Sequence, residues 1–154
     1  MPDQMGEMDY RQGAFERLSE SSYLLREARY AGCIYLAGRA TEGILRALLW
    51  RNDAEIRQGR KSLDTGHDLR QVLQRVTDLG VVRNEEHRVK LVYDVQRVAQ
   101  LWTNNMRFWS TIKVEKHWLK LGEIHARKTL KRAADDFYNA NSTIVKRCEV
   151  LCKS

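Results

Sequence analysis

Apolar residues recur at steps of three and four along most of the chain, and this spacing places side chains on one face of an α-helix. Phe15, Leu18 and Leu25 follow it with charged residues between them, so residues 15–28 are predicted to form an amphipathic helix. Residues 31–50 are apolar around most of the helix circumference. We expect this second segment to be the central and most buried helix.

Beyond residue 50 the same spacing predicts three more helices, over residues 67–80, 84–102 and 114–151. Polar, turn-forming stretches at residues 51–66 and 103–111 lie before and between them. The last helix carries a heptad-like seam, formed by Leu130, Ala134, Phe137, Asn141, Ile144, Cys148 and Leu151. Such a seam usually packs within its own bundle, but its length also permits a dimer contact in which Asn141 fixes the register.

Few residues in the chain oppose helix formation, since there is one proline, Pro2, and there are nine glycines among 154 residues. A hydrophobic fraction of 43% with 31% charged residues is typical of a globular chain, and the length is that of one ordinary domain. We therefore expect an all-α fold, an up-and-down bundle of four to five helices. It forms a single domain over residues 1–154, with its core in residues 12–151.

The sequence contains no pattern typical of a membrane or secreted protein. No stretch approaches the roughly 20 apolar residues of a membrane span, and the N-terminal residues are polar and acidic. The cysteines, Cys33, Cys148 and Cys152, match no zinc template, and small core or interface residues are a commoner role than a redox pair. We expect a cytoplasmic protein with reduced thiols, no metal and no cofactor.

Positive charge is concentrated towards the C-terminus. The net charge is +7, and residues 111–154 hold ten Lys and Arg against five Asp and Glu. Five of these cations recur at helical steps and predict one basic stripe, made of Lys113, Lys116, Lys120, Arg127 and Lys131. Such a stripe favours an anionic partner, RNA or an acidic protein, although a solvated helix face is commoner. Trp109 and Trp118 are candidates for stacking on bases or for the core.

Three segments of the chain together resemble the HEPN domain family. The first is the buried helix, whose matching residues are Tyr30, Ile34, Ala37, Ala40, Glu42, Leu45, Arg46, Ala47, Leu48 and Leu49. The second is a helix start of the form H-D-L at His67, Asp68 and Leu69, and the third is an R-F pair at Arg107 and Phe108. Their order and spacing agree with the family over roughly residues 12–150.

The resemblance implies an up-and-down helical bundle and frequent homodimers. The family includes toxins paired with small nucleotidyltransferases as antitoxins, and ribonucleases of defence systems. Its ribonucleases use an Arg followed, after about four to six residues, by a His, and they need no metal because His moves a proton while Arg stabilises the phosphorane charge.

This chain departs from that spacing. The next histidine after Arg107 is at position 117, and only three residues separate Arg83 from His87. Six residues separate Arg60 from His67, but Arg60 falls in the expected loop. The catalytic residues therefore stay unknown, with Arg107, His67, His87 and Arg83 as candidates. His67 at a helix start suits a neutral base, and it also suits a plain capping role.

Glu42 is a carboxylate in the middle of the most apolar helix, so it requires a cationic or hydrogen-bonding partner. Arg107 is the expected partner. One interpretation is a buried ion pair that fixes the bundle. The other is a polar functional cleft that holds Glu42, Asn104, Asn105 and Arg107.

Three interpretations of function remain open. The first is a HEPN-family protein of a prokaryotic toxin-antitoxin or defence system that acts on or with RNA, with endoribonuclease activity as one form of it. Its partners would be a second copy, a nucleotidyltransferase antitoxin or a larger defence complex. The second is a non-catalytic module that binds nucleotide, nucleic acid or a protein assembly through a basic C-terminal helix. The third is an unrelated helical bundle with a structural role.

Overall fold

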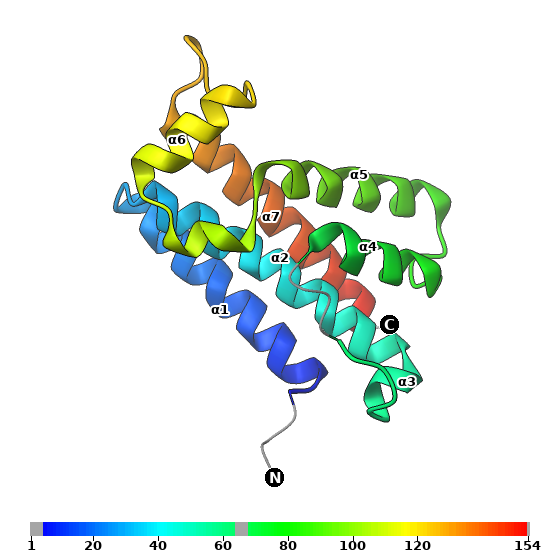
Figure 1. Ribbon diagram of the computed structural model, residues 1–154. Helices are drawn as coiled ribbons and strands as arrows, with labels where there is room; N and C mark the ends of the chain where they lie inside the picture. Colours follow the sequence, from blue (N-terminus) through cyan, green and yellow to red (C-terminus); the bar gives the residue numbers. More distant parts are fainter. Residues whose placement is uncertain (1–4, 64–67, 154) are drawn as a thin grey trace.

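The computed structural model describes residues 5–63 and 68–153, and these residues are almost entirely helical (Figure 1). The expectation of an all-α chain is confirmed for them, but the expected number of four to five helices is too low. They form seven α-helices and one short 3-10 helix, in the order α1 (Glu7–Arg26), α2 (Tyr30–Asn52), α3 (Ala54–Arg57), α4 (Leu69–Asp78), α5 (Glu85–Leu101), η1 (Asn104–Phe108), α6 (Thr111–Lys120) and α7 (Leu130–Lys153).

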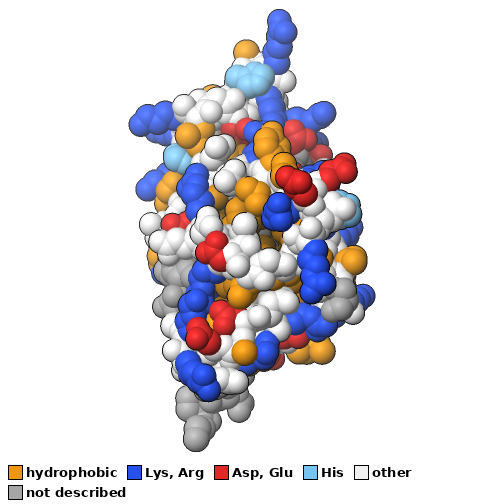
Figure 2. Space-filling model, turned by 90° about the vertical axis from the view of Figure 1, so that its right-hand side faces the viewer, with side chains coloured by type: hydrophobic (Ala, Val, Ile, Leu, Met, Phe, Trp, Pro, Cys, Tyr) orange, Lys and Arg blue, Asp and Glu red, His pale blue; other side chains and the backbone are white. Residues whose placement is uncertain are grey.

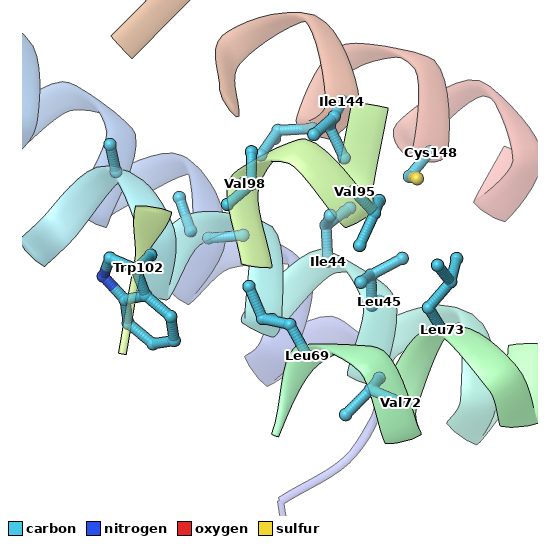
Figure 3. Packing of buried hydrophobic residues seen from close by; sticks show 14 of the residues in the cluster. Ile44, Leu45, Leu69, Val72, Leu73, Val95, Val98, Trp102, Ile144 and Cys148 are labelled. Carbon is cyan, nitrogen blue, oxygen red and sulfur yellow. The ribbon is translucent and has the colours of Figure 1, made fainter. Parts of the chain in front are cut away.

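Helix α2 is the centre of the molecule, as its apolar circumference predicts. It packs against α1, α7, α4 and η1. Ile44 and Leu45 of α2 are fully buried, and Figure 3 shows them beside Val95 of α5, with side chains of α4 and α7 around them. Each such aliphatic side chain contributes about 1.5–3 kcal/mol when it is fully buried. The core is therefore built around α2 from both sides.

The long helices alternate in direction along the chain. Figure 1 shows α2 and α7 running in the same direction across the molecule, with α1 and α5 running back against them. Ala28, with a φ of 58°, turns the chain between α1 and α2. Gly80, with a φ of 65°, turns it between α4 and α5 after the last turn of α4. Glycine suits this left-handed conformation because it lacks a Cβ.

The final segment is two helices, and the expectation of one helix over residues 114–151 is wrong. Helix α6 ends because Gly122 adopts a φ of 77°, and the N–H groups of Glu123 and Ile124 bond back to the carbonyl of Trp118. Helix α7 begins at Leu130. The apolar steps within each half are helical, but they do not reveal the turn at residues 121–129 between them.

Two other boundaries differ from the expected ones. The first helix begins at Glu7, eight residues earlier than predicted, because Gly6 caps it and its N–H is bonded to Asp9. The expected loop after α2 contains the single turn α3, where the Asp53 side chain accepts hydrogen bonds from the first N–H groups. Short polar turns of this kind carry no apolar repeat that a sequence pattern can detect.

The seam of α7 is used within the chain. Phe137, Ile144 and Cys148 are buried, and α7 packs along α2. Asn141 is also buried: its Oδ1 accepts a hydrogen bond from Thr41 of α2 at 2.5 Å, and its Nδ2 donates to the carbonyl of Phe137. Asn141 therefore fixes the register of α7 against α2. A homodimer stays a prediction, but this seam is not its interface, because its residues pack within the chain.

The end of α5 is locked onto α2 by Trp102. Its indole N–H donates to the carbonyl of Tyr35 at 3.1 Å, and its ring stacks on the Tyr35 ring. Gly38 lies directly beneath the indole, where an added Cβ would lie 2.2 Å from Nε1. Only glycine allows this close approach. Residues 103–109, which follow Trp102, start from this fixed point.

The Trp102 contact predicts a large effect of one methyl group. In Gly38→Ala the new Cβ overlaps the indole, so we expect a loss of about 1–3 kcal/mol in the free energy of unfolding. Gly13→Ala in α1 is the matched control, because no atom outside its own helix lies within 4 Å of the added Cβ. This control should gain about 0.5–1 kcal/mol. Urea unfolding followed by circular dichroism measures both, and equal effects would contradict the close contact.

Candidate functional site

A cavity of about 580 Å³ lies where α4 begins, α5 ends, and η1 and α6 pass. Residues 99–103 form one wall. The other polar and aromatic residues that line the cavity are Asp68, Arg70, Asn104, Asn105, Trp109 and His117. Segments that are far apart in the sequence thus supply one polar surface.

The start of α4 positions Arg70 at this cavity. Asp68 is the N-cap residue, and its side chain accepts a hydrogen bond from the Arg70 N–H at 2.9 Å. This cap fixes the first turn, so that Leu69 points into the core and Arg70 lies exposed at the rim. A cation is therefore held at the cavity by the local geometry of the cap.

An aromatic and cationic group forms the opposite side. The rings of Trp109 and His117 meet edge to face, with centroids 5.1 Å apart. The ammonium group of Lys113 lies 4.7 Å from the centroid of the Trp109 ring, a cation–π distance. Trp118, the other tryptophan considered for base stacking, is fully buried and donates its indole N–H to the carbonyl of Leu101. Trp118 therefore belongs to the core, and Trp109 belongs to the cavity.

Asn104 brings an unused acceptor to the cavity. Its Oδ1 is buried and has no hydrogen-bond partner within the described structure. A buried polar atom without a partner costs about 1–3 kcal/mol, so a bound donor group at this position would relieve a real penalty. Asn105, next to it, is exposed. The wall thus has both a buried acceptor and accessible amide groups.

Charged side chains are distributed differently around the cavity and on the face shown in Figure 2. On the face shown in Figure 2, cations and carboxylates are interspersed. Several charged groups of the molecule are paired, for example Arg147 with Asp94 at 3.2 Å. By contrast, Arg70 and His117 line the cavity, and Lys113 lies over the Trp109 ring beside it. Among the described residues of the lining Asp68 is the one acidic side chain, and it already accepts the Arg70 N–H. The cavity can hold a polar, negatively charged ligand that has a planar group.

The four residues of the expected polar cleft do not come together. Asn104 and Asn105 line the cavity, but Arg107 is exposed and its guanidinium lies 4.5 Å over the ring of Phe108. Glu42 lines a separate pocket of about 260 Å³ between α1 and α2. Arg107 is therefore close to Asn104 along the chain, but its side chain does not line the cavity that Asn104 lines.

Glu42 is paired, although not with the expected residue. Arg39 donates to its carboxylate at 2.8 Å, and the Arg46 guanidinium lies 3.5 Å away. Both arginines belong to α2, one turn before and one turn after Glu42. Arg107 is not among the described contacts of this carboxylate. The need for a cationic partner is confirmed, and the ion pair is formed within one helix.

Two of the catalytic candidates, Arg83 and His87, are not at the cavity. Arg83 and His87 are exposed near the start of α5, and His87 lines a different pocket with Lys90 and Arg147. The length of α5 puts this pocket about 20 Å from the cavity. His67 lies outside the described residues, so the pair of Arg60 with His67 does too.

The predicted basic stripe is divided between three elements. Lys113, Lys116 and Lys120 are exposed on α6, Arg127 lies in the turn that follows, and Lys131 lies in the first turn of α7. The three lysines of α6 share one side of that helix. Because the chain turns at residues 121–129, the helical steps that relate them to Arg127 and Lys131 do not hold.

Sequence reasoning missed two of the cavity residues, Arg70 and His117. His117 was set aside because it follows Arg107 at too long an interval, yet α6 folds back and brings it to Trp109. For Arg70 the sequence contained a signal. Asp68 is a strong N-cap residue, and the first turn at the N-terminus of a helix is a frequent anion-binding site. For His117 no sequence signal existed.

The cysteines are core residues. Cys33, Cys148 and Cys152 are buried and free, and burial raises the pKa of Cys148 to about 12 and that of Cys152 to about 11. Burial also raises the pKa of Cys33. Thiols with raised pKa values stay protonated at neutral pH and are poor nucleophiles. The interpretation as small core residues is therefore supported over a redox pair.

Comparison with known proteins finds no matching family model, no matching curated protein and no matching solved structure. Among the residues described, no helix combines the length and the hydropathy that a membrane span requires. Residues 5–63 and 68–153 also contain no group of three or more His, Cys, Asp or Glu that could hold a metal ion. The site is thus defined by its own geometry.

The raised thiol pKa values predict slow modification of the native protein. At pH 8 the reaction of the three thiols with Ellman's reagent should be at least about 100-fold slower in buffer than in urea, because burial suppresses the thiolate and access. A Ser19→Cys variant is the positive control, since Ser19 is exposed on α1. Fast reaction of a native thiol in the parent chain would contradict the buried assignment.

Proposed function

We propose that the chain is a HEPN-like helical module of a prokaryotic toxin-antitoxin or defence system, and that it binds RNA at the cavity between α4, α5, η1 and α6. One observation carries this proposal. The H-D-L helix start and the residues just before the R-F pair, which are separate in the sequence, line this one cavity together.

Each segment contributes a defined part. Asp68 and Leu69 of the H-D-L segment form the α4 side of the cavity, and Asn104 and Asn105 of the segment before the R-F pair form its wall. The buried helix α2 holds that wall in place through the contact of Tyr35 with Trp102.

The chemistry of the lining fits a nucleotide unit of single-stranded RNA. Arg70 in the lining and Lys113 over the Trp109 ring offer charge to a phosphate, and the amides of Asn104 and Asn105 offer hydrogen-bonding groups to a base or a ribose hydroxyl. Trp109 offers an aromatic surface for a base. Single-stranded RNA exposes all of these groups, whereas a duplex hides its base edges in a deep, narrow groove.

A second candidate function, cleavage of the bound RNA, is favoured by the presence of both His117 and Arg70 in the lining of the same cavity. A histidine can take the proton of the 2′-hydroxyl, and an arginine can stabilise the charge of the phosphorane. The family spacing of Arg and His is absent at this cavity, so the pair would be formed by α4 and α6 instead.

RNA binding should depend on the cavity residues. Arg70→Ala and Asn104→Ala should each weaken the binding of a fluorescein-labelled single-stranded RNA by about fivefold to tenfold, and Trp109→Ala by about tenfold or more, because stacking contributes about 1–3 kcal/mol per base. Fluorescence anisotropy at two salt concentrations measures this. Arg83→Ala removes an exposed arginine far from the cavity and is the charge-matched control; equal weakening by this control would show unspecific attraction only.

Cleavage has its own test with a labelled structured RNA in EDTA. If the cavity cleaves RNA, His117→Ala should abolish product formation while His87→Ala and Arg107→Ala retain it, because His117 is the one histidine among the described residues that lines the cavity. Loss of cleavage in His87→Ala or Arg107→Ala would assign the chemistry to another surface. Absence of cleavage by folded, RNA-binding wild type would leave binding as the function of the site.

A further inference from the structure

Helix α6 is anchored to the molecule along one side only. Its inward side chains Val114 and Trp118 are fully buried, and the Trp118 indole is bonded to the end of α5. Figure 1 shows α6 at one end of the molecule, beside the turn that leads to α7. The side of α6 opposite to Val114 and Trp118 therefore faces outward.

This outward side carries large apolar side chains. Ile112 is 67% exposed and Leu119 is 49% exposed, and their spacing of seven residues puts them on one side of the helix, about 10 Å apart. Phe108, just before α6, is 76% exposed. Leaving several large apolar side chains in water on one short element is unusual unless they are covered by a partner.

The charges around these apolar side chains are ordered. At 3.6 residues per turn, Glu115 lies on one border of the pair formed by Ile112 and Leu119. The other border is formed by Lys116, Lys120 and Lys113. None of these four charged side chains has an ion pair among the described residues, although such pairs are common elsewhere in the chain. The outward face thus has a carboxylate edge, an apolar centre and a lysine edge.

We propose that this outward face of α6 docks an acidic amphipathic helix of a partner protein. The partner helix would place apolar anchors at steps of three and four on Ile112 and Leu119. Its Asp and Glu side chains would face the three lysines, and a Lys or Arg would face Glu115. This inference goes beyond RNA binding, because Ile112 and Leu119 are not part of the cavity lining.

Charge complementarity favours this partner over the alternatives. RNA and an anionic membrane are uniformly negative, so Glu115 at the edge of the apolar centre would be repelled by them, and they would leave its preference for a cation unmet. A second copy carries the same excess of lysines on this face and the same net charge of +7, so two copies would repel one another. A helix with mostly acidic and a few basic residues offers an opposite charge to each of the three lysines and to Glu115.

The test uses a synthetic helical peptide as the probe. The peptide has about 18 residues, or five helical turns, with Leu at the anchor steps, Glu along one flank and Lys on the other. A scrambled peptide of the same composition is its control. We expect saturable binding of the patterned peptide in fluorescence anisotropy, and at least tenfold weaker binding of the scrambled one.

Variants of α6 locate the bound peptide. Leu119→Ser and Lys116→Glu should each weaken binding about tenfold, and a peptide in which only the Glu opposite residue 116 is replaced by Lys should restore affinity for Lys116→Glu. Val89→Ser and Lys90→Glu on α5 are matched controls, since Val89 and Lys90 are also exposed. Circular dichroism confirms that each variant is folded.

Three results would overturn the proposal. The first is equal binding of the patterned and scrambled peptides, or binding that the α6 variants leave unchanged. The second is a dimer of the wild type in sedimentation that Ile112→Ser disrupts, which would assign the face to a second copy. The third is binding of phosphatidylserine vesicles or an RNA oligomer that Leu119→Ser abolishes. RNA binding at the cavity is measured separately with Arg70→Ala, so failure of one proposal is distinguishable from failure of the other.

Discussion

The packing of Trp102 against Gly38 is the contact on which the arrangement of the residues around the cavity depends. This contact fixes the end of α5 on α2. The indole N–H donates to the Tyr35 carbonyl, and the ring lies so close to Gly38 that a side chain at position 38 would overlap it. The chain then turns through η1, and the carbonyl of Leu101 receives the indole of Trp118 from α6. Two tryptophans, Trp102 at the end of α5 and Trp118 in α6, thus donate hydrogen bonds to main-chain carbonyls. These two bonds hold the cavity wall in place against the core.

This construction explains why a polar cavity persists beside a well-packed core. Trp102 and Trp118 bury large apolar surfaces and still satisfy their indole N–H groups, so both rings contribute stability without leaving unpaired donors. The segment from Thr103 to Trp109 contains only the short 3-10 helix η1, and its side chains are divided between the core, where Met106 lies, and the cavity. Asn104 is left with a buried acceptor that a more regular element would have satisfied.

Periodic burial could be predicted from the sequence, and contacts between distant elements could not. The positions of α2, α4, α5 and the seam of α7 follow from apolar steps because each helix presents one side to the same core. The partner of Glu42 was predicted wrongly because a buried carboxylate signals only that a cation is near, and Arg39 and Arg46 on the same helix are equally good donors. His117 reaches the cavity through the reversal of the chain after α5, for which local spacing contains no information.

Helix α6 couples the two proposed surfaces physically. Its inner side is held rigidly by Val114 and Trp118, so the cavity and the outward face keep a fixed geometry with respect to one another. Lys113 belongs to both, because its ammonium group lies against Trp109 at the cavity and its Cα lies on the lysine edge of α6. A carboxylate of a docked partner and a phosphate of a bound nucleotide would therefore compete for one cation. Since the other charges at the cavity are few, that competition would make the affinity of each ligand depend on the presence of the other.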